Sequence, residues 1–234
     1  MNNSANIHIS VLCSVFNSED WLDSYLNAVN EQFLENFEII FIDASSTDAS
    51  LSKILNFKFR NGIKVQVLKQ ETRINIYEAW NIGALNACGE YVVNWNTDDI
   101  LYKSALLTYQ NYLLRYNNID LFYGPCFIRN SGDISSIVGF RNWPEYSHEI
   151  LSQICICGPF PLVKRSTLIQ HGLFESKYKY SGDYATWLKL SKNKCEFKKI
   201  DETIGVFYDR EDSASRLNIN TAQQEDREIQ LKYK

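Results

Sequence analysis

Apolar and amphipathic segments alternate along the first half of the chain. Several runs are rich in β-branched and aromatic residues and are bounded by polar ones, which predicts strands at 8–16, 37–44, 63–68 and 90–95. The segments between them place apolar residues at helical spacing, which predicts helices at 18–33, 47–57 and 74–88. This repeated strand and helix order predicts an α/β fold with a mostly parallel central sheet and helices on both faces.

The pattern changes after about residue 118. Two segments, 120–130 and 133–143, look like antiparallel strands joined by a turn at Ser131-Gly132. The remaining pattern predicts a helix from Ser181, a strand at 204–209 and a polar, solvent-facing helix at 221–234. No linker separates these parts. We therefore expect a single domain over 1–234, with one half at 1–118, a second half at 119–210 and a helical tail at 211–234.

The composition is that of a folded protein. Of the 234 residues, 45% are hydrophobic and 22% are charged, and the formal net charge is −4. A net negative chain without a basic block attracts neither nucleic acid nor an anionic membrane, which excludes nucleic acid as the main partner. No apolar run approaches the ~18 residues that a membrane span needs, and the N-terminus lacks a leader pattern. We expect a cytoplasmic protein without a transmembrane segment.

Three polar clusters follow predicted strands of the first half, at 14–17, 43–48 and 96–99. Ligands of open parallel sheets bind beyond the carboxyl ends of the strands. We therefore expect these clusters to converge in one crevice, although they lie far apart in the sequence.

The last of these clusters contains the adjacent carboxylates Asp98 and Asp99. One interpretation of Asp99 is the cap of a helix that begins near Tyr102. Asp98, at the end of a central strand, is a candidate ligand for a hard divalent cation whose remaining positions are filled by substrate phosphates. Such an ion would neutralise charge that develops on a phosphate leaving group.

Arg73 opens the third predicted helix, and Arg73, Tyr77 and Asn81 are spaced four apart, so they share one helix face. An arginine and two hydrogen-bonding groups that point away from the core suggest an anionic, aromatic ligand such as a nucleotide. The planar guanidinium suits a diphosphate because it can bind two oxygens together. The alternative for Arg73 is a surface ion pair, which contributes little to stability.

Asp183 lies just inside the predicted helix that starts at Ser181. One interpretation is a carboxylate stabilised by the helix dipole. The other is a general base that is held rigidly over the crevice and takes a proton from an attacking hydroxyl. The sequence contains neither the glycine-rich dinucleotide motif nor the P-loop motif, which argues against those two kinds of nucleotide site.

Four segments, in this order, resemble the inverting family 2 glycosyltransferases of the GT-A fold: 9–29, 37–50, 75–101 and 172–190. The likeness covers roughly residues 8–210. Members of this family use nucleotide sugars and build bacterial polysaccharides and glycoconjugates. The resemblance implies a Rossmann-like GT-A sheet with a small antiparallel region on the acceptor side, so that 1–118 would bind the nucleotide sugar and 119–210 the acceptor.

The resemblance also implies roles for single positions in the donor site. The loop from Ser14 to Asn17, which includes Phe16, would cradle the nucleotide base, and Asp43 would hydrogen-bond it. Arg73 would neutralise the diphosphate, and Asn81 is included in the nucleotide-sugar site with it.

The remaining implied roles concern the metal and the base. Asn96, Thr97 and Asp98 stand where the family has its DxD motif, and Asp98 would bind Mg²⁺ or Mn²⁺. Asp183 matches the catalytic base. Asn96 replaces the usual first acidic residue of that motif, and an amide can still accept from ribose hydroxyls or coordinate through its carbonyl. Ser14 replaces the usual proline of the first motif, which loosens that loop.

We therefore expect an inverting, metal-dependent transfer from a UDP, GDP or dTDP sugar to a saccharide or lipid-linked saccharide, in the cytoplasm or at the inner face of the membrane. Trp143, Tyr146 and Phe160 are candidates for stacking on an acceptor sugar. Two alternatives stay open. A catalytically inactive binding or assembly module is favoured by Asn96, and a sugar-phosphate nucleotidyltransferase would carry a glycine-rich, basic signature near its first strand.

Overall fold

The computed structural model describes residues 8–133 and 135–233. The described strands are β1 (Ile9–Val15), β2 (Phe37–Asp43), β3 (Ile63–Lys69), β4 (Tyr91–Asn94), β5 (Ile100–Leu101), β6 (Leu121–Tyr123), β7 (Cys126–Arg129), β8 (Ile137–Arg141), β9 (Leu162–Lys164), β10 (Phe197–Lys199) and β11 (Gly205–Tyr208). The described helices are α1 (Glu19–Asn30), α2 (Ser50–Asn56), α3 (Ile76–Asn86), α4 (Ala105–Arg115), α5 (His148–Gln153), α6 (Arg165–Gln170), α7 (Gly182–Lys192), α8 (Ala214–Leu217) and α9 (Ile219–Tyr233).

The central sheet has the strand order β10-β6-β9-β4-β1-β2-β3. β1 pairs in parallel with β2 and β4, and β2 pairs in parallel with β3. Of the described strands in this sheet, β9 alone runs antiparallel to its neighbours β4 and β6. The predicted mostly parallel sheet is confirmed. The carboxyl ends of β1, β2 and β4 meet at one edge, so the loops that follow these strands lie together.

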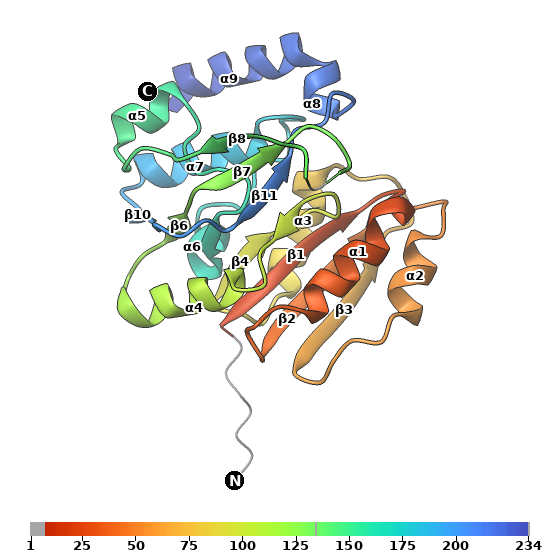
Figure 1. The fold of residues 1–234 in the computed structure, drawn as a ribbon. Coiled ribbons are helices and arrows are strands. Elements are labelled where there is room, and N and C mark those ends of the chain that lie inside the picture. Colours follow the sequence, from red (N-terminus) through yellow and green to blue (C-terminus); the bar gives the residue numbers. More distant parts are fainter. Residues whose placement is uncertain (1–7, 134, 234) are drawn as a thin grey trace.

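Helices cover both faces of the central sheet (Figure 1). Helices α1, α2 and α4 pack against one face in an apolar cluster that includes Leu26 and Leu106. Helices α3, α6 and α7 pack against the other face in a second cluster that includes Trp80 and Trp187. The approach of α3 is close, because a Cβ atom at Gly83 would lie 2.9 Å from a methyl carbon of Ile42. Apolar packing thus fixes the helices that border the sheet edge.

A second, smaller sheet has the order β5-β11-β7-β8. β7 and β8 form the expected antiparallel pair, whereas β11 is parallel to β7. The predicted strand at 120–130 is wrong as one element: it is divided into β6, which joins the central sheet, and β7. The break falls at Gly124-Pro125 because proline lacks the N–H that a continuous strand would need.

The C-terminal segment forms α8 and α9. α9 is polar, as expected, but one edge of it is buried through Ala222, Ile229 and Tyr233. The helix is therefore docked on the domain as well as exposed to solvent. No helix within 8–133 and 135–233 combines the length and the apolar character that crossing a membrane requires.

Glu38 is a buried carboxylate near the amino end of β2, far along the strand from Asp43. Its side chain is 0% exposed and forms an ion pair of 2.9 Å with Lys64. Ser10 Oγ, Gln66 Nε2 and the backbone N–H of Cys88 donate hydrogen bonds to it over 2.6, 2.7 and 2.8 Å. Burial by itself would raise the pKa of Glu38, but these bonds outweigh burial and lower the pKa to about 2.

We expect Glu38→Gln to lower the free energy of unfolding by about 3 kcal/mol at pH 7, because the donors around it lose their ionised acceptor. The folded-state pKa of about 2 lies below the ordinary value of 4.5, so the contribution is complete above about pH 4.5 and is lost as the pH falls toward 2. Urea unfolding at pH 7 and pH 3 measures the difference between the two proteins. It should shrink at pH 3, and an unchanged difference would contradict this role.

Candidate active site

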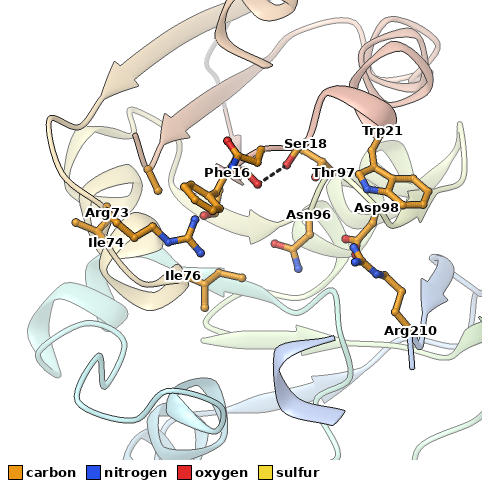
Figure 2. A pocket seen from close by; sticks show the side chains of 13 residues that line it. Phe16, Ser18, Trp21, Arg73, Ile74, Ile76, Asn96, Thr97, Asp98 and Arg210 are labelled. Atoms are coloured by element: carbon orange, nitrogen blue, oxygen red, sulfur yellow. Dashed lines mark hydrogen bonds and ion pairs between the residues drawn. The ribbon is translucent and has the colours of Figure 1, made fainter. Parts of the chain in front are cut away.

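A cleft of about 490 Å³ opens at the carboxyl edge of the central sheet (Figure 2). It is lined by the loops that follow β1 and β4, by the loop before α3, by Trp21 of α1 and by Arg210 beyond β11. Of the nine residues predicted for the site, six line this cleft: Ser14, Phe16, Arg73, Asn96, Thr97 and Asp98. Asp43, Asn81 and Asp183 are not among the lining residues.

Hydrogen bonds join the loop after β1 to the loop after β2. Asn17 adopts the left-handed conformation with φ of 46°. Its backbone N–H donates to Ser46 Oγ over 3.1 Å, and its side-chain oxygen accepts from the N–H of Thr47 over 2.9 Å. The N–H of Ser18 donates to Ser50 Oγ over 2.7 Å. These bonds fix two of the three polar clusters against each other.

Asp43 is the last residue of β2 and is 0% exposed. Its Oδ1 accepts from the N–H of Ser46 over 3.1 Å, whereas Oδ2 is buried without a hydrogen-bond partner in the described part of the chain. The next residue, Ala44, lines the cleft. Asp43 therefore lies directly behind the cleft wall with one acceptor unused, which is costly for a buried carboxylate.

Arg73 lies in the loop before α3 and does not open the helix as expected. The helix begins later because Asn75 and Glu78 form a capping box, with bonds of 2.9 Å from the Glu78 N–H and 2.8 Å to the Glu78 carboxylate. The Arg73 guanidinium lies over the ring of Phe16, with 3.1 Å between its central carbon and the ring centroid. This contact holds a cation at one side of the cleft.

The helix face that was expected to point toward a ligand is packed against the protein. Tyr77 is 4% exposed and donates through its hydroxyl to Asp183 Oδ1 over 3.1 Å. The side chain of Asn81 donates to the carbonyl of Phe174 over 2.9 Å and accepts from its N–H over 2.8 Å. The predicted placement of Asn81 in the nucleotide site is thus not met, because both halves of its amide are bonded to backbone outside the cleft.

Asp98 and Arg210 form an ion pair in the cleft, with 3.4 Å between Oδ2 and Nη1. Arg210 also binds Asp212 through two bonds of 2.9 Å, and Asp212 and Asp98 together raise the pKa of the guanidinium. The side chains of Arg73 and Arg210 extend into the cleft from opposite sides, with Asn96 between them (Figure 2). Arg210 is absent from the predicted site, although a charged residue directly after a predicted strand is a usable signal.

Asp99 holds the loop after β4 in place. It is 5% exposed and accepts from the N–H of Tyr208 over 2.9 Å, which ties this loop to β11. Burial and the neighbouring charge of Asp98 raise the pKa of Asp99. The predicted cap is wrong, because the next helix, α4, begins at Ala105 after Ser104.

Asp183 is the second residue of α7 and lines a separate cavity of about 300 Å³. Arg141, Trp143 and Asp209 also line this cavity, and Asp98 does not. The three polar clusters share one cleft as expected, but Asp183, which was expected over that cleft, lines a second cavity. The two cavities are neighbours, because Asp209 lines the cavity of Asp183 and the next residue, Arg210, lines the cleft. Ile76 and Tyr77 form a second link between the two cavities. Ile76 lines the cleft, and the hydroxyl of Tyr77 donates to Asp183.

The surroundings of Asp183 make it a stronger base than an ordinary aspartate. Burial raises the pKa of Asp183, while hydrogen bonds from the N–H of Tyr184 and from the Tyr77 hydroxyl act in the opposite direction. A raised pKa brings a carboxylate closer to the range that suits proton transfer at neutral pH. The position before it must be glycine, because a Cβ atom at Gly182 would lie 2.6 Å from the Glu175 carbonyl oxygen and 2.7 Å from the Tyr77 ring.

Of the aromatic residues expected to stack on an acceptor, Trp143 alone lines the cavity of Asp183. Tyr146 is already stacked on Phe197, with 4.5 Å between ring centroids and 10° between planes. Phe160 is 4% exposed and belongs to the core. The prediction that Tyr146 and Phe160 stack on an acceptor sugar is therefore wrong.

The sheet topology, the cleft at its carboxyl edge and the small accessory sheet define the GT-A class of glycosyltransferases. S. aureus TarS 1–349 has a similar structure, with a TM-score of 0.73 and 20% identity over 86% of this chain and 60% of that one. TarS has also been solved with UDP-GlcNAc. Other solved structures of this fold contain Mn²⁺ together with GDP-Man or UDP.

The chain belongs to glycosyl transferase family 2, whose family model matches residues 10–152. The amylovoran biosynthesis glycosyltransferase AmsB of Erwinia amylovora is 23% identical over 87% of this chain and 70% of its own length. The UDP-Glc:α-D-GlcNAc-diphosphoundecaprenol β-1,3-glucosyltransferase WfgD of Escherichia coli is 26% identical over 79% of this chain and 70% of its own length. Nothing in these matches favours a nucleotidyltransferase.

Proposed function

We propose that this protein transfers a sugar from a nucleoside-diphosphate sugar to an acceptor hydroxyl with inversion at the anomeric carbon. The observation that carries the proposal is the pairing of two adjoining cavities. One contains Asp98, Asn96 and two arginines, and the other contains Asp183. The donor would occupy the first and the acceptor the second, with the transferred sugar at their junction.

The donor cleft has the charges that a nucleoside diphosphate requires. Arg73 and Arg210 supply two guanidinium groups, which suit paired phosphate oxygens. Asp43 Oδ2, which has no hydrogen-bond partner among the described residues, offers an acceptor to an N–H of the base, with Phe16 and Ser14 in the loop beside it. The donor would be a UDP, GDP or dTDP sugar, and the UDP-GlcNAc complex of TarS supports the first of these.

The residues at the end of β4 fit a divalent cation such as Mg²⁺ or Mn²⁺. Asn96 Oδ1 is buried without a hydrogen-bond partner in the described residues, and Asp98 supplies a carboxylate in the same cleft. Within 8–133 and 135–233, no group of three or more acidic, histidine or cysteine residues forms a complete metal cage. A cation would therefore need diphosphate oxygens as further ligands. When bound, it would offset the charge on the leaving diphosphate.

Asp183 would take the proton from the acceptor hydroxyl. The hydroxyl oxygen forms a bond to the anomeric carbon while the bond from that carbon to the phosphate oxygen breaks, and the nucleoside diphosphate leaves with the electron pair. Arg73 and Arg210 would stabilise the departing charge. No covalent intermediate with the enzyme is needed, so positioning and electrostatics supply the rate.

The acceptor would be a saccharide or a lipid-linked saccharide, with Trp143 as the surface on which a sugar ring stacks. The relative WfgD is named for an α-D-GlcNAc-diphosphoundecaprenol acceptor, and AmsB for amylovoran biosynthesis. A lipid-linked acceptor would bring the enzyme to the inner face of the membrane.

Calorimetric titration with UDP, GDP and dTDP, each with and without Mn²⁺, tests the proposal. We expect one of the three to bind at least about tenfold more tightly with Mn²⁺, which corresponds to about 1.4 kcal/mol. Product analysis with the matching sugar nucleotide and a saccharide acceptor then identifies the transferred sugar. Failure of all three nucleotides to bind would overturn the proposal and favour an inactive binding module.

A further inference from the structure

Glu225 of α9 accepts hydrogen bonds from three successive backbone N–H groups. Oε1 accepts from Lys179 over 2.9 Å, and Oε2 accepts from Tyr180 over 2.9 Å and from Ser181 over 3.1 Å. Glu225 follows these three donors by 44 to 46 residues in the sequence. One side chain of α9 therefore fixes the segment that leads into α7. A carboxylate with three N–H donors is a strong, charge-assisted arrangement.

The bonded segment leads directly into the helix that carries Asp183. Ser181 is the residue before α7, and its side chain makes no capping hydrogen bond. The N–H groups at the start of a helix have no partner within the helix, so an external acceptor decides how such a start is held. Glu225 accepts from the Ser181 N–H, at the N-cap, and from the two N–H groups that precede it.

The helix that carries Glu225 is itself firmly seated. Ile229 is 0% exposed in the apolar cluster around α7, and Tyr233 is 6% exposed. Gln230 donates to the carbonyl of Gln153 over 2.9 Å and to the Tyr184 hydroxyl over 3.3 Å. α9 therefore contacts the segment before Asp183 and the residue after it.

The start of α7 also lies against α3. Gly182 has no room for a Cβ atom beside Tyr77, and the Tyr77 hydroxyl bonds to Asp183. The start of α7 is thus held both by α3 and by Glu225. Loss of either contact would leave the segment held by the other alone.

We infer that Glu225 is a positioning residue for the transfer reaction: its carboxylate fixes the start of α7 so that Asp183 faces the junction of the two cavities. The inference rests on the proposed role of Asp183 as the base. Glu225 touches neither cavity, so it acts through the backbone of 179–181. A displacement of about 1 Å at a reacting group can cost about 100-fold in rate.

Glu225→Ala and Glu225→Gln test the inference, with Glu228→Ala as the matched control. Glu228 is an exposed carboxylate on the same helix, and its Oε1 accepts a hydrogen bond from Gln224 Nε2 over 3.0 Å. We expect Glu225→Ala to lower kcat by at least about tenfold, while the KM for the donor and the affinity for its nucleotide stay within about twofold. The kcat of Glu225→Gln should lie between those of the wild type and Glu225→Ala. Glutamine keeps one acceptor oxygen, but its NH₂ group is a donor and faces at least one backbone N–H.

Hydrogen exchange separates positioning from general destabilisation. In Glu225→Ala, the amides of residues 179–181 should exchange faster while those of β1 and β2 keep their protection. In the background of Asp183→Asn, the same substitution should have no further effect on kcat, because the group it positions is already gone.

Two results would overturn the inference: a kcat of Glu225→Ala equal to that of Glu228→Ala, or an equal proportional loss of kcat in the Asp183→Asn background. Full activity of Asp183→Asn by itself would instead remove the proposed base. The failure of the inference and the failure of the proposed function are therefore distinguishable.

Discussion

Asp183→Asn is expected to lower kcat by about 10²- to 10⁴-fold, the range that general bases contribute, while nucleotide binding stays nearly unchanged. Asparagine has the same shape but cannot accept the proton of the acceptor hydroxyl. Binding should persist because Asp183 lines the smaller cavity and the nucleotide would occupy the cleft of Arg73 and Asp98. Steady-state kinetics together with nucleotide calorimetry on the same variant measure both quantities.

The pH dependence of kcat gives this prediction an internal control. The base must be ionised, so activity should fall as the pH drops through the raised pKa of Asp183. Tyr77→Phe removes a hydrogen bond that favours the carboxylate, so the acidic limb should move to higher pH in this variant. A kcat of Asp183→Asn close to that of the wild type, with the acidic limb intact, would assign the base to another residue.

Asp98→Ala is expected to abolish the effect of Mn²⁺ on nucleotide affinity. The substitution removes the one carboxylate at the end of β4 that lines the donor cleft, which leaves Asn96 as the remaining protein oxygen of the proposed metal site. The affinity measured with Mn²⁺ should therefore fall to the level measured without it, which is a loss of at least about tenfold. Without Mn²⁺ the affinity should not fall, because the cleft loses a negative charge and Arg210 loses one of its two carboxylate partners.

Asp212→Ala is the matched control. Asp212 binds the same arginine through two bonds of 2.9 Å but does not line the cleft. It should leave the Mn²⁺ effect in place. If Asp98→Ala and Asp212→Ala respond equally to Mn²⁺, then Asp98 is not a metal ligand.

The parallel half of the fold was predictable because its signals are local. β1, β2 and β4 are short apolar runs, and the helices between them carry apolar residues at helical spacing. The rule that ligands bind beyond the carboxyl ends of parallel strands then placed Ser14, Asn96 and Asp98 at one edge. Neither step needs knowledge of how distant segments pack.

The errors about where the side chains of α3 point, and the omission of Arg210 and Glu225, share one physical cause, which is packing between distant segments. Tyr77 and Asn81 look free on a helical wheel, yet the 174–183 segment covers them. Arg210 meets Asp98 across 112 residues, and Glu225 reaches the start of α7 only because α9 folds back. A single sequence carries no record of these contacts.

The division between the cleft and the neighbouring cavity affects how much of the bound donor is transferred to the acceptor and how much is hydrolysed by water. Water is the smallest molecule that can enter the space beside Asp183, and a poorly filled space would let it attack in place of a sugar hydroxyl. Loss of activated sugar to solvent would then depend on how completely the acceptor fills the pocket around Trp143. The fraction of donor sugar that is transferred and not hydrolysed would thus be set by the half of the molecule that does not hold the nucleotide.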